Sequence, residues 1–482
     1  MALDDVLIVG CGITGAATAF MLSKFQLKVG ILERENDVSE GATKANSAIL
    51  HAGYDPKPGT LMEKLNVRGV ELARELCRQL DVPYRQCGSM VLAFSEGEKR
   101  TLQELLRRGE ANGVQNLKIL SGEAAGKLEP AISREVTAAL FAPTAAVCSP
   151  WELCLALAET AVQNGTELHL ETEVQGICRK AEGYAVQTNR GILETRFVVN
   201  AAGVFAEQVH NMVSAPTFSM KPSRGEYYLL DKCEGAKVDH VLFQCPNKNG
   251  KGVLVASTVH GNLIVGPSTE PVNGNDTANT AEGLAFVRAK AEKSVPHVDY
   301  RQSIRNFSGV RARTDHPDFI IGFPDDAPGF LDLAGICSPG LSAAPAVGEY
   351  AVKLLEEAGL SLIPKENFSC TRRKIRFKAL SDTEKRELIA KEPSYGRVIC
   401  RCETVTEGEI LACFRTPIPP RSLDGVKRRV NTGMGRCQGG FCGPRIVELL
   451  ANCLGVQPGE ILQDRAGSRV LLEKTKGGAA DV

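Results

Sequence analysis

The sequence predicts an α/β protein whose first part is a Rossmann-like nucleotide-binding domain and whose last hundred residues form a small helical domain. Three observations support this. The glycines of Gly10-Cys-Gly-Ile-Thr-Gly15 follow an apolar run directly. Four cysteines near the C-terminus fall into two close pairs. The length of 482 residues exceeds what one hydrophobic core usually supports, so two or three domains are expected.

Charge and composition exclude several classes of partner. Lys plus Arg (57) equals Asp plus Glu (57), so we expect no nucleic acid or anionic membrane as a general partner. No apolar run approaches the length of a transmembrane helix, and Val6–Val9 is too short for the core of a signal peptide. Sixteen cysteines in a long chain of this kind indicate reduced thiols. We therefore expect a cytoplasmic location, with membrane contact only through another protein.

The first 33 residues have the pattern of a βαβ unit. Val6–Val9 is typical of a buried parallel strand, Ala16–Leu22 has helix-forming composition, and Lys28–Leu32 predicts the next strand. Glycines in the turn let the backbone approach a pyrophosphate, to which the helix N-terminus offers N–H groups. A carboxylate follows the second strand, where it binds ribose hydroxyls. The expected cofactor residues here are Gly10, Gly12, Ile13, Thr14, Gly15, Glu33 and Arg34, and this motif alone does not separate FAD from NAD.

The segment from Gly41 to Thr60 favours FAD. Small and hydroxylated residues crowd it, as expected for a stretch that passes close to a flat, bulky group. At this point the chain, from residue 3 to about 365, resembles the D-amino-acid-oxidase-like superfamily of FAD-dependent amine and hydroxy-acid oxidoreductases. The resemblance implies that Thr43, Asn46 and Ser47 lie along the cofactor. Asn46–Gly53 and Lys57–Thr60 look most like FAD-dependent glycerol-3-phosphate dehydrogenases and L-2-hydroxyglutarate dehydrogenases or oxidases.

Three later segments agree with that resemblance. Glu171–Val174 fits the strand over the adenine, Phe197–Gly203 fits the second nucleotide crossover, and Leu333–Ala344 resembles the C-terminal FAD segment. In the last of these, a strand, a glycine-rich turn and a helix N-terminus point N–H groups at the flavin ring or the ribityl chain. The resemblance adds these cofactor residues: Val174, Ala202, Gly203, Gly309, Gly335, Pro339, Gly340, Leu341 and Ser342.

Hydride removal from an alcohol carbon requires a base that takes the hydroxyl proton. Our candidate is His51, because the resemblance puts its segment beside the isoalloxazine and because imidazole titrates near neutral pH. The alternative is a structural histidine that is hydrogen-bonded to the backbone.

Cationic side chains must hold an anionic substrate. Arg224 lies in Lys221–Tyr228, which resembles the start of a substrate-domain strand, and Arg311 lies in Gly309–Asp315, which resembles the segment that returns toward the flavin. An arginine fork binds phosphate and carboxylate equally well, so the substrate stays open between them. For each arginine the alternative is a structural or surface ion pair.

The composition changes near Pro364–Pro393, where charged residues dominate. We therefore expect an FAD-dependent oxidoreductase part at residues 1–365, with an α+β substrate part interleaved at roughly 80–150 and 215–320. A helical or irregular linker is expected at 366–395, followed by a cluster domain at 396–465 and a tail at 466–482.

Two helices are expected in the cluster domain. Thr406–Glu409 resembles a capping box before a helix at Ile410. Pro444 suits the first turn of a helix after Cys442.

The two cysteine pairs are Cys400 with Cys402 and Cys437 with Cys442. Four thiolates held by two tight, glycine-rich turns can ligate an iron–sulfur cluster. The segment resembles the bacterioferritin-associated-ferredoxin-like (BFD-like) [2Fe-2S] domain, in which two cysteine pairs bind one cluster, and the resemblance implies the same here. Zinc is the alternative, although C-x-C is an unusual spacing for it. The basic run Lys427–Arg429 predicts a solvated face or, alternatively, a docking site for an acidic redox partner.

The expected function is an FAD-dependent dehydrogenase of glycerol-3-phosphate that passes electrons through the cluster to a partner subunit or a quinone route. The resemblance implies this substrate, because dehydrogenases of that type most often carry such an appended domain. The alternatives are L-2-hydroxyglutarate or another 2-hydroxy acid, an amine or imino acid, and a flavoprotein with an iron-handling or regulatory cluster module. An NAD-dependent reductase is a further alternative, which the lack of a second G-x-G-x-x-G after a strand disfavours. A small anionic substrate and an electron-accepting protein are the expected partners, and an oligomer is compatible with the sequence.

Overall fold

The computed structural model describes residues 3–246 and 252–473, and the predicted tail from residue 474 onward lies outside them. The chain divides into two compact units. Unit 1 contains the chain up to Leu32 together with Ser39–Arg372, and unit 2 contains Glu33–Val38 together with the chain from Arg373 onward. The linker predicted at 366–395 is thus shared between the units.

The nucleotide-binding sheet of unit 1 is centred on β1 (Asp4–Val9), whose apolar side chains are buried. This strand pairs in parallel with β2 (Val29–Leu32) on one side and with β12 (Gly191–Asn200) on the other, and β12 pairs in parallel with β20 (Phe330–Ala334). The predicted strand–helix–strand order of the first 32 residues is confirmed. The sheet also contains β9 (Glu167–His169), β10 (Val174–Arg179), β11 (Tyr184–Thr188) and β19 (Ile320–Gly322).

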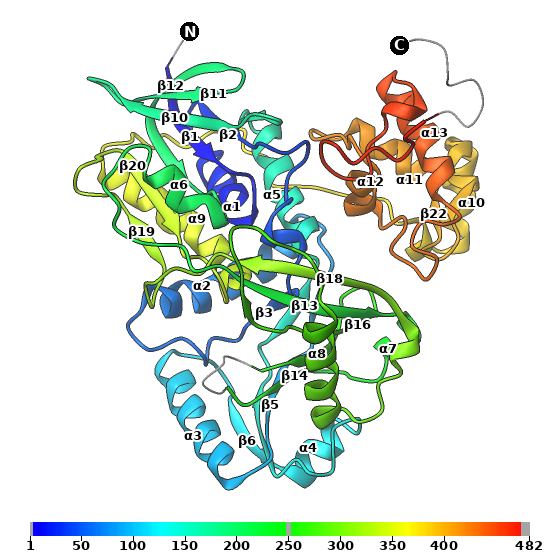
Figure 1. Ribbon diagram of the computed structural model, residues 1–482. Helices are drawn as coiled ribbons and strands as arrows, with labels where there is room; N and C mark the ends of the chain where they lie inside the picture. The colour runs from blue at the N-terminus through cyan, green and yellow to red at the C-terminus, as the bar shows by residue number, and fades with distance from the viewer. Residues whose placement is uncertain (1–2, 247–251, 474–482) are drawn as a thin grey trace. The chain divides into compact units, whose positions relative to one another are not determined.

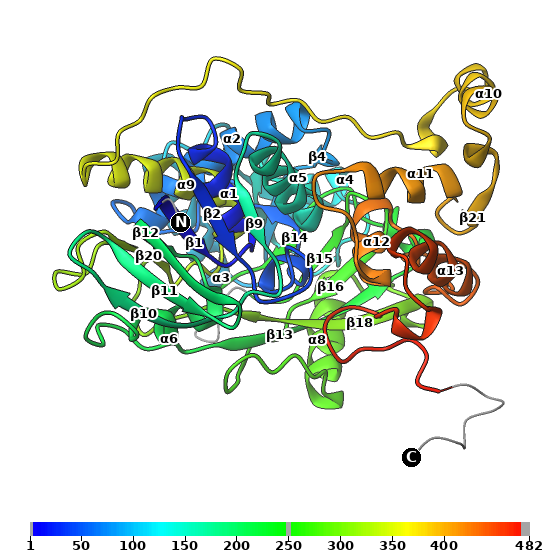
Figure 2. The same cartoon turned by 90° about the horizontal axis from the view of Figure 1, so that it is seen from above.

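Helix α1 (Ile13–Leu22) packs against both α5 (Pro150–Gln163) and α9 (Gly340–Glu357) (Figures 1 and 2). Helix α2 (Leu61–Gln79) packs on α9. The helix α9 approaches α1 closely because Gly348 has no side chain: a Cβ there would lie 2.7 Å from the carbonyl carbon of Ala17. A Cβ on Gly69 of α2 would lie 2.1 Å from the carbonyl oxygen of Ser342. The absence of a side chain at Gly348 and at Gly69 therefore permits both close helix contacts. The contact at Gly69 places α2 directly against the start of α9.

A second sheet carries the interleaved part of unit 1. Its two longest strands, β13 (Ser223–Leu230) and β18 (Ser303–Arg311), form an antiparallel ladder. Successive residues of β5 (Ser89–Ala93) and β7 (Ala138–Ala142) alternate between two buried apolar clusters, so both faces of the sheet are covered. The other strands are β6 (Lys118–Ser121), β14 (Val241–Gln244), β15 (Leu254–Ser257), β16 (Leu263–Gly266) and β17 (Glu270–Pro271).

Shorter elements complete unit 1. A small sheet consists of β3 (Ile49–Leu50), β4 (Tyr84–Gln86) and β8 (Ala146–Cys148). The remaining helices are α3 (Glu96–Ala111), α4 (Gly122–Leu128), α6 (Ala206–His210), α7 (Lys232–Gly235) and α8 (Ala281–Ser294).

Unit 2 is mainly helical. It contains α10 (Asp382–Lys391), α11 (Glu407–Ala412), α12 (Leu423–Val430), α13 (Gly443–Leu454), β21 (Val398–Cys400) and β22 (Val405–Thr406). The predicted capping box is confirmed, because Thr406 Oγ1 accepts from the Glu409 N–H while the Glu409 carboxylate accepts from the Thr406 N–H. Pro444 lies in the first turn of α13, as predicted.

One predicted strand is wrong. Of Glu171–Val174, only Val174 belongs to a strand, where it begins β10. Glu171 lies in a turn and has a φ of +53°, a left-handed conformation outside the range of regular strand residues.

Within the described part of the chain, no helix has both the length and the apolar character needed to cross a bilayer.

Candidate functional site

The turn after β1 requires glycine at two positions. Gly10 has a φ of +97°, and a Cβ on it would lie 2.7 Å from the carbonyl oxygen of Ala201. A Cβ on Gly15 would lie 2.0 Å from the carbonyl oxygen of Gly10. At the start of α1 the N-cap residue is Gly12, which has no side chain, and the Ile13 N–H donates to Thr43 Oγ1 at 3.0 Å instead. The helix N-terminus thus faces the place where a pyrophosphate is expected.

Two further segments reach the same edge of the sheet. The Gly10 N–H donates to the Leu32 carbonyl at 2.8 Å, and Glu33 follows Leu32 directly. The Ala201 N–H donates to the Val9 carbonyl at 3.0 Å, so the predicted residues Ala202 and Gly203 come just after the ends of β1 and β12. Open α/β sheets bind nucleotides at this carboxyl edge. The geometry therefore fits the dinucleotide expected from the sequence.

The other predicted cofactor residues lie at element ends. Gly335 has a φ of +68° and follows β20, and Pro339, Gly340 and Leu341 begin α9. Arg34 is paired with the Glu35 carboxylate at 3.1 Å. Their contact with a cofactor stays a prediction, as does that of Val174.

The segment that contains Thr43, Asn46 and Ser47 is organised by its own hydrogen bonds. The Asn46 amide donates to the Thr43 carbonyl at 2.8 Å, and Asn46 Oδ1 accepts from the Ala48 N–H at 2.7 Å. The end of the segment is tied to α9, because the fully buried Ser342 hydroxyl accepts from the His51 N–H at 2.7 Å. The structure therefore brings the early segment and the C-terminal FAD segment together.

One face of the β13–β18 ladder lies against this segment. A Cβ on Gly309 would lie 1.9 Å from the carbonyl oxygen of Ala45, so β18 touches the segment backbone directly. The Tyr227 hydroxyl of β13 lies 3.1 Å from Ser47 Oγ. Because side chains alternate along a strand, the residues of this face can be read from the strand register. We call it the cofactor face, formed by Gly225, Tyr227, Phe307, Gly309 and Arg311.

Arg311 ends β18 on the cofactor face. Its Nη2 packs over Gly225, where a Cβ would lie 2.5 Å away, and donates to the Ser268 carbonyl at 3.3 Å. Its Nη1 is buried and has no hydrogen-bond partner among the described residues. Burying a guanidinium nitrogen without an acceptor costs free energy. This atom is therefore suited to an anion that the protein itself does not supply.

Arg224 lies on the opposite face of the same ladder. Its guanidinium pairs with the Glu270 carboxylate at 2.6 Å and the Asp276 carboxylate at 2.9 Å, and only 5% of the residue is exposed. The structure therefore does not bring Arg224 and Arg311 together. For Arg224 the geometry favours the alternative stated above, a structural ion pair.

The His51 ring is oriented by stacking. It lies 5.3 Å from the ring of Phe243, between centroids, at an interplanar angle of 25°. The His51 carbonyl accepts from the Asn66 amide at 3.3 Å, and its N–H is held by Ser342. The backbone is thus anchored on both sides, while the role of the ring as a base stays a prediction.

Two aromatic residues of the cofactor face are not among the residues predicted from the sequence. Tyr227 and Phe307 stack with centroids 4.8 Å apart at an angle of 9°. Tyr227 lies three residues after Arg224, so strand alternation alone separates the two faces. The alternation of side chains along the strand could be read from the sequence. It assigns residues to a face only when the orientation of one residue of the strand is already known.

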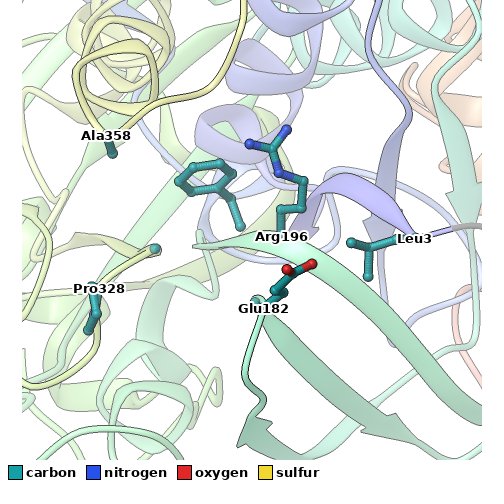
Figure 3. A pocket seen from close by; sticks show the side chains of 8 residues that line it. Leu3, Glu182, Arg196, Pro328 and Ala358 are labelled. Carbon is teal, nitrogen blue, oxygen red and sulfur yellow. The ribbon is translucent and has the colours of Figure 1, made fainter.

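A separate cavity of about 470 Å³ lies at the other edge of the nucleotide-binding sheet (Figure 3). Leu3 directly precedes β1, and Gly329 directly precedes β20, so this is the amino edge of the parallel strands. Because nucleotides bind at the carboxyl edge, the cavity is not the cofactor site. Its lining residues are Leu3, Glu182, Gly183, Arg196, Phe197, Pro328, Gly329 and Ala358.

The four predicted cluster cysteines meet in unit 2 as two pairs, each drawn from both loops. Cys402 Sγ lies 3.7 Å from Cys437 Sγ. The Cys442 thiol hydrogen-bonds Cys400, which lowers the pKa of the Cys400 thiol to about 6. Within the described part of the chain, no three His, Cys, Asp or Glu side chains are grouped as a site for a single metal ion. Two pairs of thiols fit a two-iron cluster better than one zinc ion.

Backbone groups support the same assignment. The Phe441 N–H hydrogen-bonds Cys437 and lowers the pKa of its thiol. The N–H groups of Gly433 and Glu403 point at Cys400 in the same way. A Cβ on Gly435 would lie 2.2 Å from Cβ of Cys402, so glycine lets the two loops meet. Such N–H donors stabilise the sulfur ligands of a cluster.

The basic run Lys427–Arg429 is neither a solvated face nor a docking site. Arg428 and Arg429 are only 5% and 2% exposed, and both bind the buried carboxylate of Asp37. Arg429 forms a fork, with Nη1 at 2.7 Å and Nη2 at 3.0 Å from the two Asp37 oxygens. The expectation failed because the acid that neutralises the run lies 392 residues away in the sequence.

Comparison with known families gives two matches. Residues 5–354 match the FAD dependent oxidoreductase (DAO) family, and residues 398–452 match the BFD-like [2Fe-2S] binding domain. The second match spans all four predicted ligands. The predicted fold class and the predicted cofactors, FAD and a [2Fe-2S] cluster, are confirmed, and the alternatives of an NAD-dependent reductase and a zinc site are set aside.

Individual proteins agree with the family match. Glycerol 3-phosphate dehydrogenase of Caloramator mitchellensis is 49% identical over 474 residues, which cover 98% of this chain and 99% of that protein. Glycerol 3-phosphate oxidase of Mycoplasma pneumoniae is 32% identical over 365 residues, or 74% of this chain and 95% of that protein. The structure of dithionite-reduced L-alpha-glycerophosphate oxidase from the same organism, with FAD bound, superposes with a TM-score of 0.74 at 31% identity and covers 78% of this chain and 100% of its own. The chain therefore belongs to the FAD-dependent oxidoreductase family and carries a BFD-like [2Fe-2S] domain after its flavin-binding part.

Proposed function

We propose that this chain oxidises glycerol 3-phosphate to dihydroxyacetone phosphate and that the electrons leave through its [2Fe-2S] cluster. The observation that carries the substrate proposal is the buried Nη1 of Arg311, which has no acceptor among the described residues. A guanidinium in that state suits a phosphate or a carboxylate. The activities for which the Caloramator and Mycoplasma relatives are named favour the phosphate.

Arg311 orients the substrate in this proposal. Phosphate at Nη1 satisfies a buried donor and adds a charge-assisted hydrogen bond. The Tyr227 hydroxyl, held 3.1 Å from Ser47 Oγ on the same face, offers a second polar contact for the glycerol hydroxyls. The substrate is thereby fixed at its anionic end and along its polyol chain.

His51 takes the proton of the substrate hydroxyl as the carbinol carbon loses its hydride. Bound FAD supplies the hydride acceptor at this site. The substrate then loses one proton and one hydride, which leaves a ketone. The stacking on Phe243 and the backbone bonds to Ser342 and Asn66 limit the positions that the imidazole can take.

The thiolates of Cys400, Cys402, Cys437 and Cys442 would hold the [2Fe-2S] cluster. When bound, the cluster would accept one electron at a time, so two transfers toward an electron-accepting partner subunit or a quinone route would complete each turnover. The pairing of the four thiols in unit 2 supports this route.

An anaerobic absorption titration tests the proposal. The protein is titrated with glycerol 3-phosphate and, separately, with glycerol and L-2-hydroxyglutarate, while the flavin band and the broader cluster absorption are followed. We expect glycerol 3-phosphate to bleach the flavin first and the cluster next. Bleaching by L-2-hydroxyglutarate in its place would contradict the substrate. A cluster that stays oxidised beside a reduced flavin would contradict the electron route and favour a regulatory module.

The role of His51 has its own test. His51→Asn removes the proton acceptor, so we expect kcat to fall by roughly 10²–10⁴-fold. Reduction of the flavin by dithionite should not change. The matched control is His297→Asn, because His297 is exposed in unit 1. Equal kcat values for the two variants would remove His51 from the mechanism.

A further inference from the structure

The two thiol pairs of unit 2 differ in exposure. Cys400 and Cys442 are each 1% exposed and belong to the apolar core of unit 2, which also contains Ile446 and Leu450. Cys402 is exposed and Cys437 is half-buried. The metal site therefore has an inner and an outer pair of ligands.

The outer pair has the separation expected for ligands of one iron. Two thiolates that bind one tetrahedral metal at about 2.3 Å lie about 3.8 Å apart. Cys402 Sγ and Cys437 Sγ are 3.7 Å apart. The inner pair, Cys400 and Cys442, is likewise joined by a hydrogen bond. The outer pair would thus hold one iron of a bound cluster, and an electron on that iron would have the shorter path to solvent.

The residues next to the outer pair are cationic and apolar. Arg401 precedes Cys402 and Arg436 precedes Cys437; both are exposed, and neither side chain has an ion pair or hydrogen bond among the described residues. Phe441, which directly precedes Cys442 and whose N–H hydrogen-bonds Cys437 of the outer pair, is 77% exposed. We call Arg401, Arg436 and Phe441 the outer-iron surface.

No exposed acid neutralises this surface in the neighbouring sequence. Glu403 and Glu407 are 3% and 7% exposed. Glu407 is paired with Arg397 at 3.2 Å, and the exposed Glu448 is paired with Arg445 at 2.5 Å. The two unpaired arginines therefore give the surface a positive charge, and Phe441 adds the kind of exposed aromatic side chain that anchors protein interfaces.

We propose that the outer-iron surface docks an acidic one-electron carrier protein, which takes electrons from the outer iron. This inference rests on the proposed function, because it requires that substrate electrons reach the cluster. Each glycerol 3-phosphate supplies two electrons, and two carrier molecules are each reduced by one. Opposite charge steers the carrier to the arginines, while Phe441 supplies apolar contact in the docked complex.

The test uses the full-length holoprotein and three acceptors: cytochrome b5 as an acidic carrier, cytochrome c as a basic carrier, and a small neutral benzoquinone. Anaerobic stopped-flow measurements follow the reoxidation of protein that has been reduced by substrate. We expect the rate with the acidic carrier to fall as salt rises, because exposed charges are screened over about 8–10 Å at 0.10–0.15 M ionic strength. The rate with the basic carrier should rise or stay constant. A faster basic carrier at low salt would overturn the proposal.

Substitutions test whether Arg401, Arg436 and Phe441 are the residues that dock the carrier. Arg401→Glu with Arg436→Glu should slow the acidic carrier by about tenfold at low salt and leave the quinone rate unchanged. Phe441→Ala should slow the same carrier at every salt concentration. The charge control is Arg386→Glu with Lys391→Glu on α10, where both residues are exposed, and the apolar control is Phe286→Ala in unit 1, where the side chain is 46% exposed. Iron and sulfide content and the visible spectrum verify that each variant holds its cluster.

Two outcomes separate this proposal from the one on which it depends. If glycerol 3-phosphate never reduces the cluster of the unmodified protein, the electron route fails. If the cluster is reduced normally but all three acceptors respond to the variants alike, or the variants slow reduction of the cluster by the flavin, the outer-iron surface is not a carrier site and only this inference fails.

Discussion

Arg224 and Arg311 stand on neighbouring strands of one ladder, yet their surroundings differ completely. Arg224 faces away from the cofactor segment and is held by the carboxylates of Glu270 and Asp276. Arg311 lies on the cofactor face, and its Nη1 is buried without an acceptor among the described residues. From the sequence alone, both arginines are equally good candidates for binding the substrate. The difference lies in which charges the fold has already neutralised.

Unit 2 repeats this contrast. Arg428 and Arg429 are buried on Asp37, whereas Arg401 and Arg436 are exposed beside the outer cluster ligands. In both units an arginine that is satisfied by protein carboxylates stabilises the fold, and an arginine without such a partner is available to a ligand.

The largest effect is expected at Asp37. Asp37→Asn leaves the buried guanidinium groups of Arg428 and Arg429 without their shared charge, and breaking a buried pair costs about 3–5 kcal/mol. Urea unfolding followed by cluster absorbance should show this loss. The control is Asp464→Asn, since the Asp464 side chain is more exposed and pairs with Arg428 at the longer distance of 3.2 Å. Equal urea midpoints for the two variants would contradict a stabilising role of the Asp37 ion pairs.

The next effect concerns the ligand side. Arg311→Lys keeps the positive charge but loses the fork, so we expect kcat/KM for glycerol 3-phosphate to fall by roughly 30- to 100-fold, about 2–3 kcal/mol. Steady-state rates with a neutral quinone acceptor measure it. The melting temperature should change little, because Arg311 has no carboxylate partner among the described residues. A variant that is unstable but fully active would reverse the assignment.

Acid should remove part of the stability that Asp37 provides. Burial raises the pKa of this carboxyl, but the charges and hydrogen bonds of Arg429 and Arg428 outweigh it and lower the pKa from 3.8 to about 2. The unfolded chain therefore binds the proton more readily than the folded one. The contribution, roughly 2 kcal/mol, is complete above pH 4 and is lost as pH falls through about 2. The difference in urea midpoint between the unmodified protein and Asp37→Asn should shrink over that range, and a constant difference would contradict the ion pair.

The smallest effect is expected at Arg224. Arg224→Met leaves two carboxylates that are each about half exposed, so water can solvate them and the loss of stability should be about 1–2 kcal/mol. Because Arg224 faces away from the cofactor, KM for glycerol 3-phosphate should stay within about twofold of the original. Thermal unfolding and steady-state kinetics measure the two quantities. A large increase in KM would place Arg224 in the substrate site after all.

The features that could be predicted from sequence are those whose determinants are close together in the chain. The glycines from Gly10 to Gly15, the capping box of Thr406 with Glu409 and the Pro444 turn depend on neighbouring residues, and the structure contains them as expected. Glu171–Val174 failed because one residue in a left-handed conformation turns the chain. Local rules describe short segments well, but a single turn residue can override them.

The features that could not be predicted depend on distant partners. The acids that hold Arg224 lie 46 and 52 residues away, and Asp37 lies 392 residues from Arg429. Which arginine is left over for a substrate follows only from the pairing of β13 with β18. The two cysteine motifs could be recognised singly, whereas the pairing of Cys402 with Cys437 required the meeting of both loops.

The most direct test of the account is substrate selectivity in Arg311→Met and Arg224→Met. The ratio of kcat/KM for glycerol 3-phosphate to kcat/KM for glycerol measures how much the phosphate contributes to catalysis. We predict that Arg311→Met lowers this ratio by roughly 100- to 1,000-fold, because a buried charge partner is lost, and that Arg224→Met leaves it unchanged. An Arg311→Met protein that still prefers the phosphorylated substrate as strongly as the unmodified protein would contradict the assignment of the anion site.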